Sequence, residues 1–246
     1  MRPLVDRREE LRVLEEWFGK GRVALLFGRR RVGKTRLVLE FIKGKRAVYL
    51  LAADSTLEYN LRKFSEELSA RFGVPGLRFA DFEELFEFIE RRDDVDLIAI
   101  DEFGYLVRAG TLPQFQRVVD LILRSKKLLL TGSTVSAIEN ELLGYRSPLY
   151  GRIDLVKRVL PLRFHHLLEW FPGAPFEGAL AVYAATGGVP RYLEFFSQCS
   201  LDEVKRVMLN PDTLPFRDAK LILEEELPEP RRYFLVLEAI ASGRTR

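Results

Sequence analysis

The residues with the clearest chemical meaning lie near the start of the chain, in the segment RVALLFGRRRVGKT at positions 22–35. An apolar run from Val23 to Phe27 is followed by Gly28 and, after four residues, by Gly33-Lys34-Thr35, which is the P-loop pattern GxxxxGK[ST]. Glycines let such a loop curl its N–H groups around a phosphate chain, and the N-terminus of the following helix attracts the same anion. The segment therefore predicts a nucleoside triphosphate site.

Side chains of the loop supply the rest of this site. Lys34 is expected to reach the β- and γ-phosphates, and the Thr35 hydroxyl is expected to bind Mg²⁺. ATP and Mg²⁺ are the cofactors that the pattern indicates. The residues expected to bind the nucleotide are Gly28, Arg29, Arg30, Arg31, Val32, Gly33, Lys34, Thr35 and Arg36.

A second motif places two carboxylates after an apolar run, where Asp101 and Glu102 follow residues 97–100. Asp101, at the carboxyl end of a strand, would hold the Mg²⁺ shell, and Glu102 would orient and polarise the attacking water. A further strand-like segment at 46–51 separates the two motifs, which is typical of P-loop enzymes with an added strand between the Walker segments. Small-molecule kinases usually lack that strand and the second carboxylate, so this function is disfavoured.

Polar residues after later apolar runs are candidates for sensing the γ-phosphate. Thr131 and Ser133 end the run at 128–130, although Ser133 could instead cap a helix expected over 135–143. Arg152 follows Gly151, and near the carboxyl edge of the sheet it would be an arginine finger. The alternative for Arg152 is a structural salt bridge.

Hydrophobic periodicity predicts alternating strands and helices up to residue 160 and helices thereafter. The fold class that this order favours is α/β, with a P-loop core whose parallel sheet is flanked by helices. Strands are expected at 23–27, 46–51, 95–100, 128–133 and 153–160, and helices around 11–18, 34–42, 56–72, 80–91, 114–124, 177–185, 191–196 and 229–241.

Composition narrows the class of protein. The 246 residues are 47% hydrophobic with a net charge of +3, so we expect a globular protein for which nucleic acid is permitted but not required. Cys199 is the only cysteine, which excludes a disulfide framework and a multi-cysteine metal site. Without an apolar leader or membrane span in the sequence, we expect a cytoplasmic protein, and the 30% of charged residues suggests a thermophile.

Five segments together resemble the archaeal AAA-type ATPase family, in the STAND clade of signal-transduction ATPases and near the Orc1/Cdc6 replication initiators. They are Gly28-Arg29-Arg30-Arg31-Val32-Gly33-Lys34-Thr35, Ile100-Asp101-Glu102-Phe103, Thr131-Gly132-Ser133, Ser147-Pro148-Leu149-Tyr150-Gly151-Arg152 and Thr186-Gly187-Gly188-Val189-Pro190-Arg191-Tyr192-Leu193. The resemblance implies an ATPase core at 1–160, a small all-helical lid at 161–226, and at 227–246 the first helix of a truncated winged helix.

The resemblance also implies roles for individual residues. Arg152 would be a sensor or finger arginine, and Pro190 and Arg191 would lie where the lid meets the nucleotide. Val5 and Arg7 would border the adenine, although Asp6 stands where the family usually has glycine.

Two functions remain open. The first is a Mg²⁺-dependent ATPase, slow without a partner, that acts as a nucleotide-driven switch. The alternative is an ATP-regulated DNA-binding protein of the replication-initiator or mobile-element type, which would bind duplex DNA through the missing C-terminal winged helix. A homo-oligomer is possible, and no membrane partner is expected.

Overall fold

The computed structural model describes residues 5–133, 141–227 and 229–244, apart from the side chains of 219, 222, 225 and 226. It divides into two compact units, Met1–Leu160 and Pro161–Arg246. Most of the helix expected over 135–143 lies outside the described residues. The first unit contains, in chain order, α1 (Arg8–Lys20), β1 (Val23–Phe27), α2 (Lys34–Phe41), β2 (Ala47–Leu51), α3 (Leu57–Phe72), α4 (Phe82–Glu90), β3 (Leu97–Asp101), α5 (Gly104–Arg108), α6 (Leu112–Arg117), the π-helix η1 (Val118–Ile122), β4 (Lys127–Gly132) and β5 (Leu155–Arg158).

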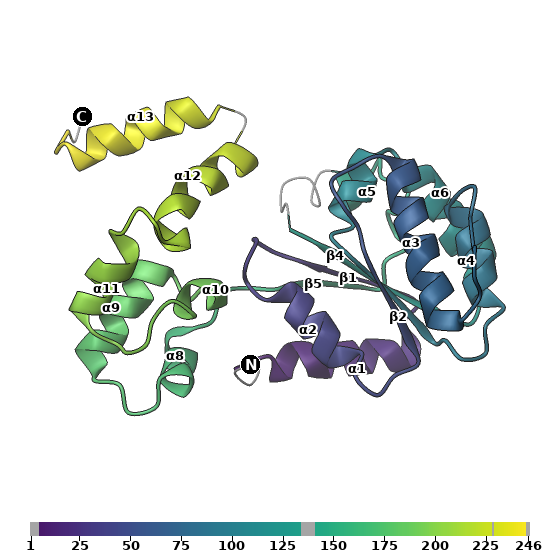
Figure 1. Cartoon of the computed structure of the whole chain (residues 1–246), viewed down its shortest axis with the longest axis horizontal. Helices are drawn as coiled ribbons and strands as arrows, with labels where there is room; N and C mark the ends of the chain where they lie inside the picture. The colour runs from purple at the N-terminus through teal and green to yellow at the C-terminus, as the bar shows by residue number, and fades with distance from the viewer. Residues whose placement is uncertain (1–4, 134–140, 228, 245–246) are drawn as a thin grey trace. The chain divides into compact units, whose positions relative to one another are not determined.

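Strands of the first unit form a parallel sheet in the order β2-β3-β4-β1-β5 (Figure 1). The P-loop strand β1 and the Asp-Glu strand β3 are not neighbours, because β4 pairs with both. Phe27 is opposite Gly132, and Ile100 is opposite Leu130, so the carboxyl ends of these three strands meet at one edge. The expected α/β fold class is confirmed, and the strand expected at 46–51 is present as β2, although it lies at the edge of the sheet and β4 is the strand between β1 and β3.

Each face of the sheet has its own core, since successive residues of a strand point to opposite faces. On one face α1 and α2 pack on the sheet through Leu14, Trp17 and Phe41. On the other face α3 to α6 and η1 build the larger core (Figure 1), whose aromatic centre includes Phe103 and Phe115. These two layers hold the sheet rigid behind the loops at its carboxyl edge.

The helix expected over 114–124 is interrupted. Its first part is α6, and the second part is η1, where Leu123 N–H donates to Val118 O at 2.9 Å, an i to i+5 bond. The wider turn puts Leu123 in the core with 1% exposure, while Ile122 is only partly buried. A regular α-helix would have buried Ile122 instead, since it lies on the face of Val118 and Val119.

The described part of the second unit is helical. Its elements are α8 (Phe164–Trp170), α9 (Phe176–Thr186), α10 (Pro190–Leu193), α11 (Leu201–Met208), α12 (Leu214–Glu226) and α13 (Pro230–Ala241). None of the residues of α13, the segment expected to start a winged helix, is buried. Across the described residues, no helix has the length and apolar content needed to cross a bilayer.

Candidate nucleotide site

The P-loop connects the buried strand β1 to the N-terminus of α2. Gly28 and Gly33 have φ values of 154° and 95°, which suit glycine, and Arg31 between them has φ 70°. A Cβ on Gly28 would lie 2.3 Å from the carbonyl oxygen of Val159, so the close packing of the loop against the chain after β5 also requires glycine. The loop thereby places backbone N–H groups at a helix N-terminus, which is an anion-binding arrangement.

Lys34 lies folded onto this loop. Its ammonium donates to Gly28 O at 2.8 Å and to Arg29 O at 3.1 Å, and the residue is 4% exposed. Burial lowers the pKa of Lys34, whereas the nearby carboxylates of Glu102 and Asp101 act to raise it. The lysine is thus a buried cation close to both carboxylates.

Asp101 ends β3 and has no exposed surface. Its Oδ1 accepts hydrogen bonds from the Thr131 hydroxyl and, at 3.0 Å, from the N–H of Glu102. Its Oδ2 accepts the phenolic O–H of Tyr49, from β2, at 2.8 Å. Burial and the charge of Asp101 raise the pKa of Tyr49, so this phenol remains a donor at neutral pH. Donors from β2 and β4, the two strands that pair with β3, thus fix the orientation of the Asp101 carboxylate.

Glu102 adopts a left-handed backbone with φ 56°, which is unusual for a residue with a side chain. Its N–H also lies 3.1 Å from Thr131 Oγ1, and its Oε1 accepts the Ser133 hydroxyl at 2.6 Å. Phe103 N–H donates to Thr131 O at 2.7 Å. The end of β4 therefore holds the turn that carries Glu102, and backbone strain at such a position is a common mark of a functional site.

Thr131 and Ser133 thus bind the carboxylates, where the sequence indicated a contact with the γ-phosphate. Sequence reasoning missed Tyr49 and also Tyr105, whose hydroxyl accepts from Arg30 at 3.1 Å. A tyrosine inside a strand resembles any core aromatic, so only the sheet order reveals that Tyr49 faces Asp101. Thr35 is exposed and Arg36 half-buried at the start of α2.

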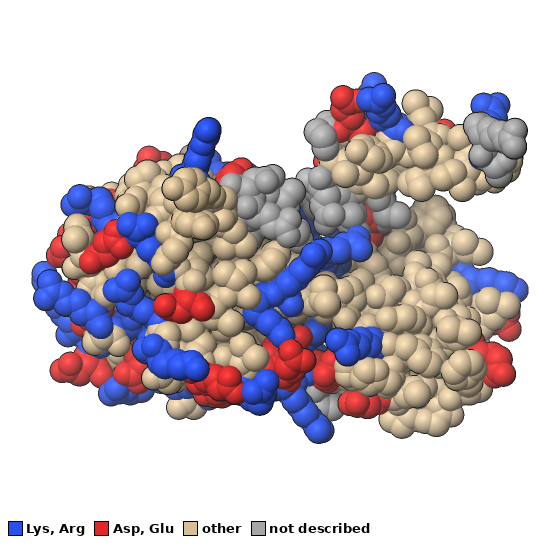
Figure 2. All heavy atoms as spheres, turned by 180° about the vertical axis from the view of Figure 1, so that it is seen from behind, with Lys and Arg blue, Asp and Glu red and all other residues tan. Residues whose placement is uncertain are grey.

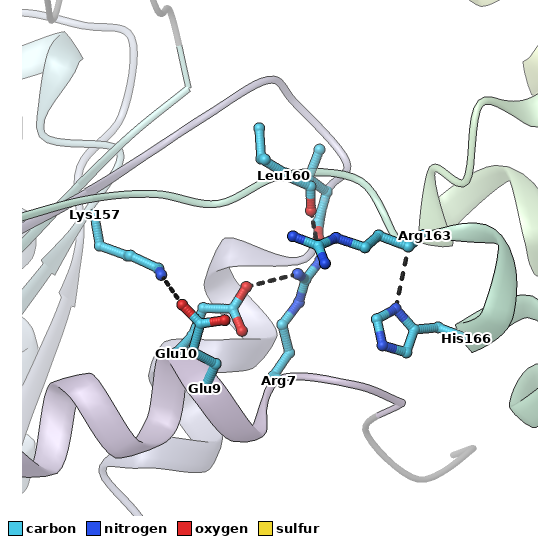
Figure 3. Close-up of polar contacts among 8 residues, drawn as sticks. Arg7, Glu9, Glu10, Lys157, Leu160, Arg163 and His166 are labelled. Carbon is cyan, nitrogen blue, oxygen red and sulfur yellow. Dashed lines mark hydrogen bonds and ion pairs between the residues drawn. The ribbon is translucent and has the colours of Figure 1, made fainter.

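Arg7 has a different environment from the adenine border that was expected. Its guanidinium is 4% exposed and donates to Val32 O at 2.8 Å, to Leu160 O at 2.9 Å and to Glu10 at 2.9 Å (Figure 3). These bonds direct its nitrogens to backbone carbonyls of the core. Val5 is half-buried just before it.

The position expected for Arg152 was wrong. Arg152 precedes β5, and Asp154 beside it accepts the N–H groups of Arg22 and Val23 at the start of β1. In a parallel sheet this is the amino edge, opposite the P-loop. There Arg152 makes two 2.8 Å bonds to Asp120, the salt bridge that was the alternative. The structure does not bring Arg152 to the P-loop of its own chain.

Pro190 and Arg191 begin α10 in the second unit. Arg191 pairs with Glu194, the residue directly after that helix. Their expected contact with the nucleotide stays a prediction.

Residues 4–196 match the family described as an ATPase domain predominantly from Archaea. The chain belongs to this archaeal ATPase family. The match covers the P-loop, the Asp-Glu strand and the start of the second unit, so the motifs described above lie within the family's own boundaries.

A curated relative of this ATPase domain is the uncharacterised protein MJECL04 of Methanocaldococcus jannaschii. The two are 33% identical over 247 residues, an alignment that covers 97% of this chain and 54% of that protein. The chain therefore spans about half the length of this relative.

Solved structures share the fold of the ATPase domain. The Walker-type ATPase PABY2304 of Pyrococcus abyssi has a TM-score of 0.62 at 23% identity, over 99% of this chain and 78% of that one. The ORC2 protein of Aeropyrum pernix, in ADPNP and ADP complexes, has 0.63 at 14% identity, over 98% and 76%. ORC1 of the same organism, in complex with DNA, has 0.59 at 21% identity, over 83% and 65%. These likenesses establish the P-loop ATPase fold.

The donor set also fits Mg²⁺. Mg²⁺ in nucleotide sites is held by one or two protein oxygens together with phosphates and waters, and needs no cage of protein ligands. The exposed Thr35 hydroxyl and the Asp101 carboxylate are such oxygens. Among the described residues there is no cluster of three His, Cys, Asp or Glu side chains suited to a metal.

Proposed function

We propose that this chain binds ATP with Mg²⁺, hydrolyses it slowly, and acts as a nucleotide-driven molecular switch. The observation that carries the proposal is the placement of Lys34 close to Asp101 and Glu102, so that a phosphate-binding cation and two oriented carboxylates share one edge of the sheet. Burial of the Lys34 ammonium costs desolvation free energy, which the two carboxylates partly offset, and the carbonyl partners of the ammonium lie in the loop where phosphate oxygens would replace them.

In this proposal the P-loop from Gly28 to Arg36 surrounds the phosphates with its N–H groups, and Lys34 exchanges its carbonyl partners for β- and γ-phosphate oxygens. Thr35 and Asp101 would hold Mg²⁺, which supplies charge neutralisation on the phosphates. Glu102 would orient and polarise the water that attacks the γ-phosphorus.

Other residues would position these groups. Thr131 would act by holding Asp101 and the turn at Glu102, as its two hydroxyl contacts allow. Val5 is proposed to border the adenine, with Arg7 supporting the loop beneath it. Pro190 and Arg191 are proposed to approach the nucleotide from the second unit, which would report the bound state to an output module.

Arg152 is proposed as a finger that acts on a neighbouring copy. Its salt bridge to Asp120 holds it at the amino edge of its own sheet, so only the site of another chain is open to it. This part of the proposal requires a homo-oligomer.

Binding of a fluorescent ATP analogue tests the proposal directly. Lys34→Ala should weaken binding by at least tenfold, because a charge-assisted contact to phosphate is lost. Lys43→Ala is the matched control, since Lys43 is an exposed lysine paired with Glu40 at the end of α2. Equal affinities of the wild type and Lys34→Ala would remove the proposed site.

The second candidate function is ATP-regulated DNA binding. It is favoured by the fold shared with ORC1, whose structure was solved in complex with DNA, and by α13, which follows the lid where a winged helix would begin. On the face in Figure 2, Lys and Arg are interspersed with Asp and Glu, which does not favour a DNA surface there. Binding of duplex DNA that weakens with salt would support this function, and none at low salt would remove it for this chain.

A further inference from the structure

The chain leaves the core through a short segment, Val159–Leu162, which we call the strap. Its first half is attached to the P-loop. Val159 N–H donates to Phe27 O at 2.7 Å, and its carbonyl packs so closely on Gly28 that a Cβ there would come within 2.3 Å. One end of the loop thus touches the strap directly.

Arg7 attaches the other end of the loop to the same strap. A single guanidinium nitrogen, NH2, donates to Val32 O at 2.8 Å and to Leu160 O at 2.9 Å (Figure 3). The second nitrogen, NH1, bonds Glu10, which is itself 12% exposed. Because the guanidinium is buried, its bonds are little weakened by water. A shift of Val32 would therefore displace the Arg7 guanidinium and, through the shared nitrogen, the carbonyl of Leu160.

The second half of the strap is attached to the other unit. Leu162 N–H donates to Gly188 O at 2.9 Å, and Gly188, with φ 69°, packs on Leu162 O where a Cβ would come within 2.1 Å. Between the two halves stands Pro161, which fixes its own φ and confines Leu160 to extended conformations. Val159 and Leu160 are therefore held by contacts within the first unit, and Leu162 by a contact within the second.

We propose that Arg7 is a positioning residue that couples the conformation of the P-loop to the strap, and through it to Gly188 in the second unit. The inference rests on the proposed function for its ligand, since phosphates bound between Gly28 and Lys34 are what would move Val32. Arginine is required because its planar fork donates in several directions from a fixed position, whereas lysine offers one compact charge.

Hydrogen exchange in the protein without nucleotide tests the coupling first. Arg7→Lys should speed exchange by roughly five- to tenfold, as expected for a lost hydrogen bond, in peptides that cover the P-loop and the strap alike. Arg8→Lys, an exposed neighbour on α1, is the control and should change neither. Faster exchange in the P-loop with an unchanged strap would overturn the inference.

The same experiment with an ATP analogue and Mg²⁺ separates this inference from the proposed function. In the wild type the analogue should slow exchange in the P-loop and the strap together. In Arg7→Lys it should still bind and slow exchange in the P-loop, but the response of the strap should fall to less than half. A full strap response in Arg7→Lys would overturn the coupling. Absence of analogue binding to the wild type would instead overturn the proposed function.

Glu10→Gln keeps the inference testable should Arg7→Lys not fold. It leaves Arg7 in place but removes the charge that holds NH1. The expected changes in exchange have the same direction and are smaller, about two- to threefold. Identical exchange in the strap of Glu10→Gln and the wild type would count against the coupling.

Discussion

The hydroxyl of Ser133 donates a 2.6 Å hydrogen bond to Oε1 of Glu102, the carboxylate that we propose activates water. The bond joins the residue after β4 to the residue after β3, two strands that pair directly. Glu102 is thus held by its side chain as well as by its backbone, in a left-handed conformation. Its orientation depends on a neighbouring strand rather than on its own segment.

Ser133→Ala tests that dependence. Without its donor, Glu102 should sample several rotamers, and turnover of ATP should fall by about tenfold, part of the 10²- to 10⁴-fold that a general base contributes. The affinity for ATP should remain within about twofold of the wild type, because Ser133 is not expected to touch the phosphates. Ser65→Ala, which removes a buried hydroxyl bonded to Leu61 O, is the control. Unchanged turnover in Ser133→Ala would show that Glu102 needs no such support.

Tyr49→Phe removes the donor to Asp101 Oδ2. We expect the Mg²⁺ concentration for half-maximal ATP binding to rise several-fold, because the carboxylate loses one of the bonds that orient it. The free energy of unfolding should fall by about 1 kcal/mol, as for other lost hydrogen bonds. ATP binding measured in EDTA should be unaffected. Tyr183→Phe in the second unit is the matched control, and an equal Mg²⁺ response in both variants would contradict the role of Tyr49.

The backbone strain at Glu102 can be measured by comparing two substitutions. At φ 56° alanine pays the steric cost of its Cβ and glycine does not, so Glu102→Gly should be more stable than Glu102→Ala by about 0.5 to 1 kcal/mol. Both variants should be inactive. Chemical denaturation of the two proteins gives the difference. A more stable alanine variant would mean that the left-handed turn does not persist in solution.

Mixing two inactive variants tests the role of Arg152. Arg152→Ala retains an intact P-loop, and Lys34→Ala retains its arginine, so a mixed oligomer can combine the two. We expect turnover several-fold above the sum of the separate proteins. If the Arg152→Ala protein alone has wild-type turnover, Arg152 is not a finger, and its role is limited to the salt bridge with Asp120.

Much of this fold could be predicted from local sequence patterns, namely apolar runs and the motifs that follow them. Buried parallel strands such as 23–27 and 97–100 are continuous apolar runs, and the P-loop and the Asp101-Glu102 pair follow them directly. The order of the strands places both motifs at one edge. Local sequence carries this information because each motif is contiguous with the strand that positions it.

Contacts between distant segments could not be predicted in this way. Arg7 lies 25 residues from Val32 and 153 from Leu160 along the chain. The sequence around Arg7 does not indicate that its guanidinium bonds the carbonyls of these two residues. Arg152 directly precedes the strand expected at 153–160, but it was assigned to the wrong edge because the sequence does not reveal that this strand pairs parallel to β1, which puts its start at the amino edge. For both arginines the role depends on the partners of the side chain, and these partners are known only from the assembled sheet.

Steady-state hydrolysis of ATP with Mg²⁺, compared between the wild type and Glu102→Gln, tests the central claim most directly. We expect slow turnover by the wild type, a loss of at least 100-fold in Glu102→Gln, and unchanged ATP affinity in the variant. Turnover per protein molecule, measured at two protein concentrations, would show whether a neighbouring copy contributes to hydrolysis. Equal turnover in the two proteins would contradict the assignment of Glu102 and, with it, the hydrolytic site described above.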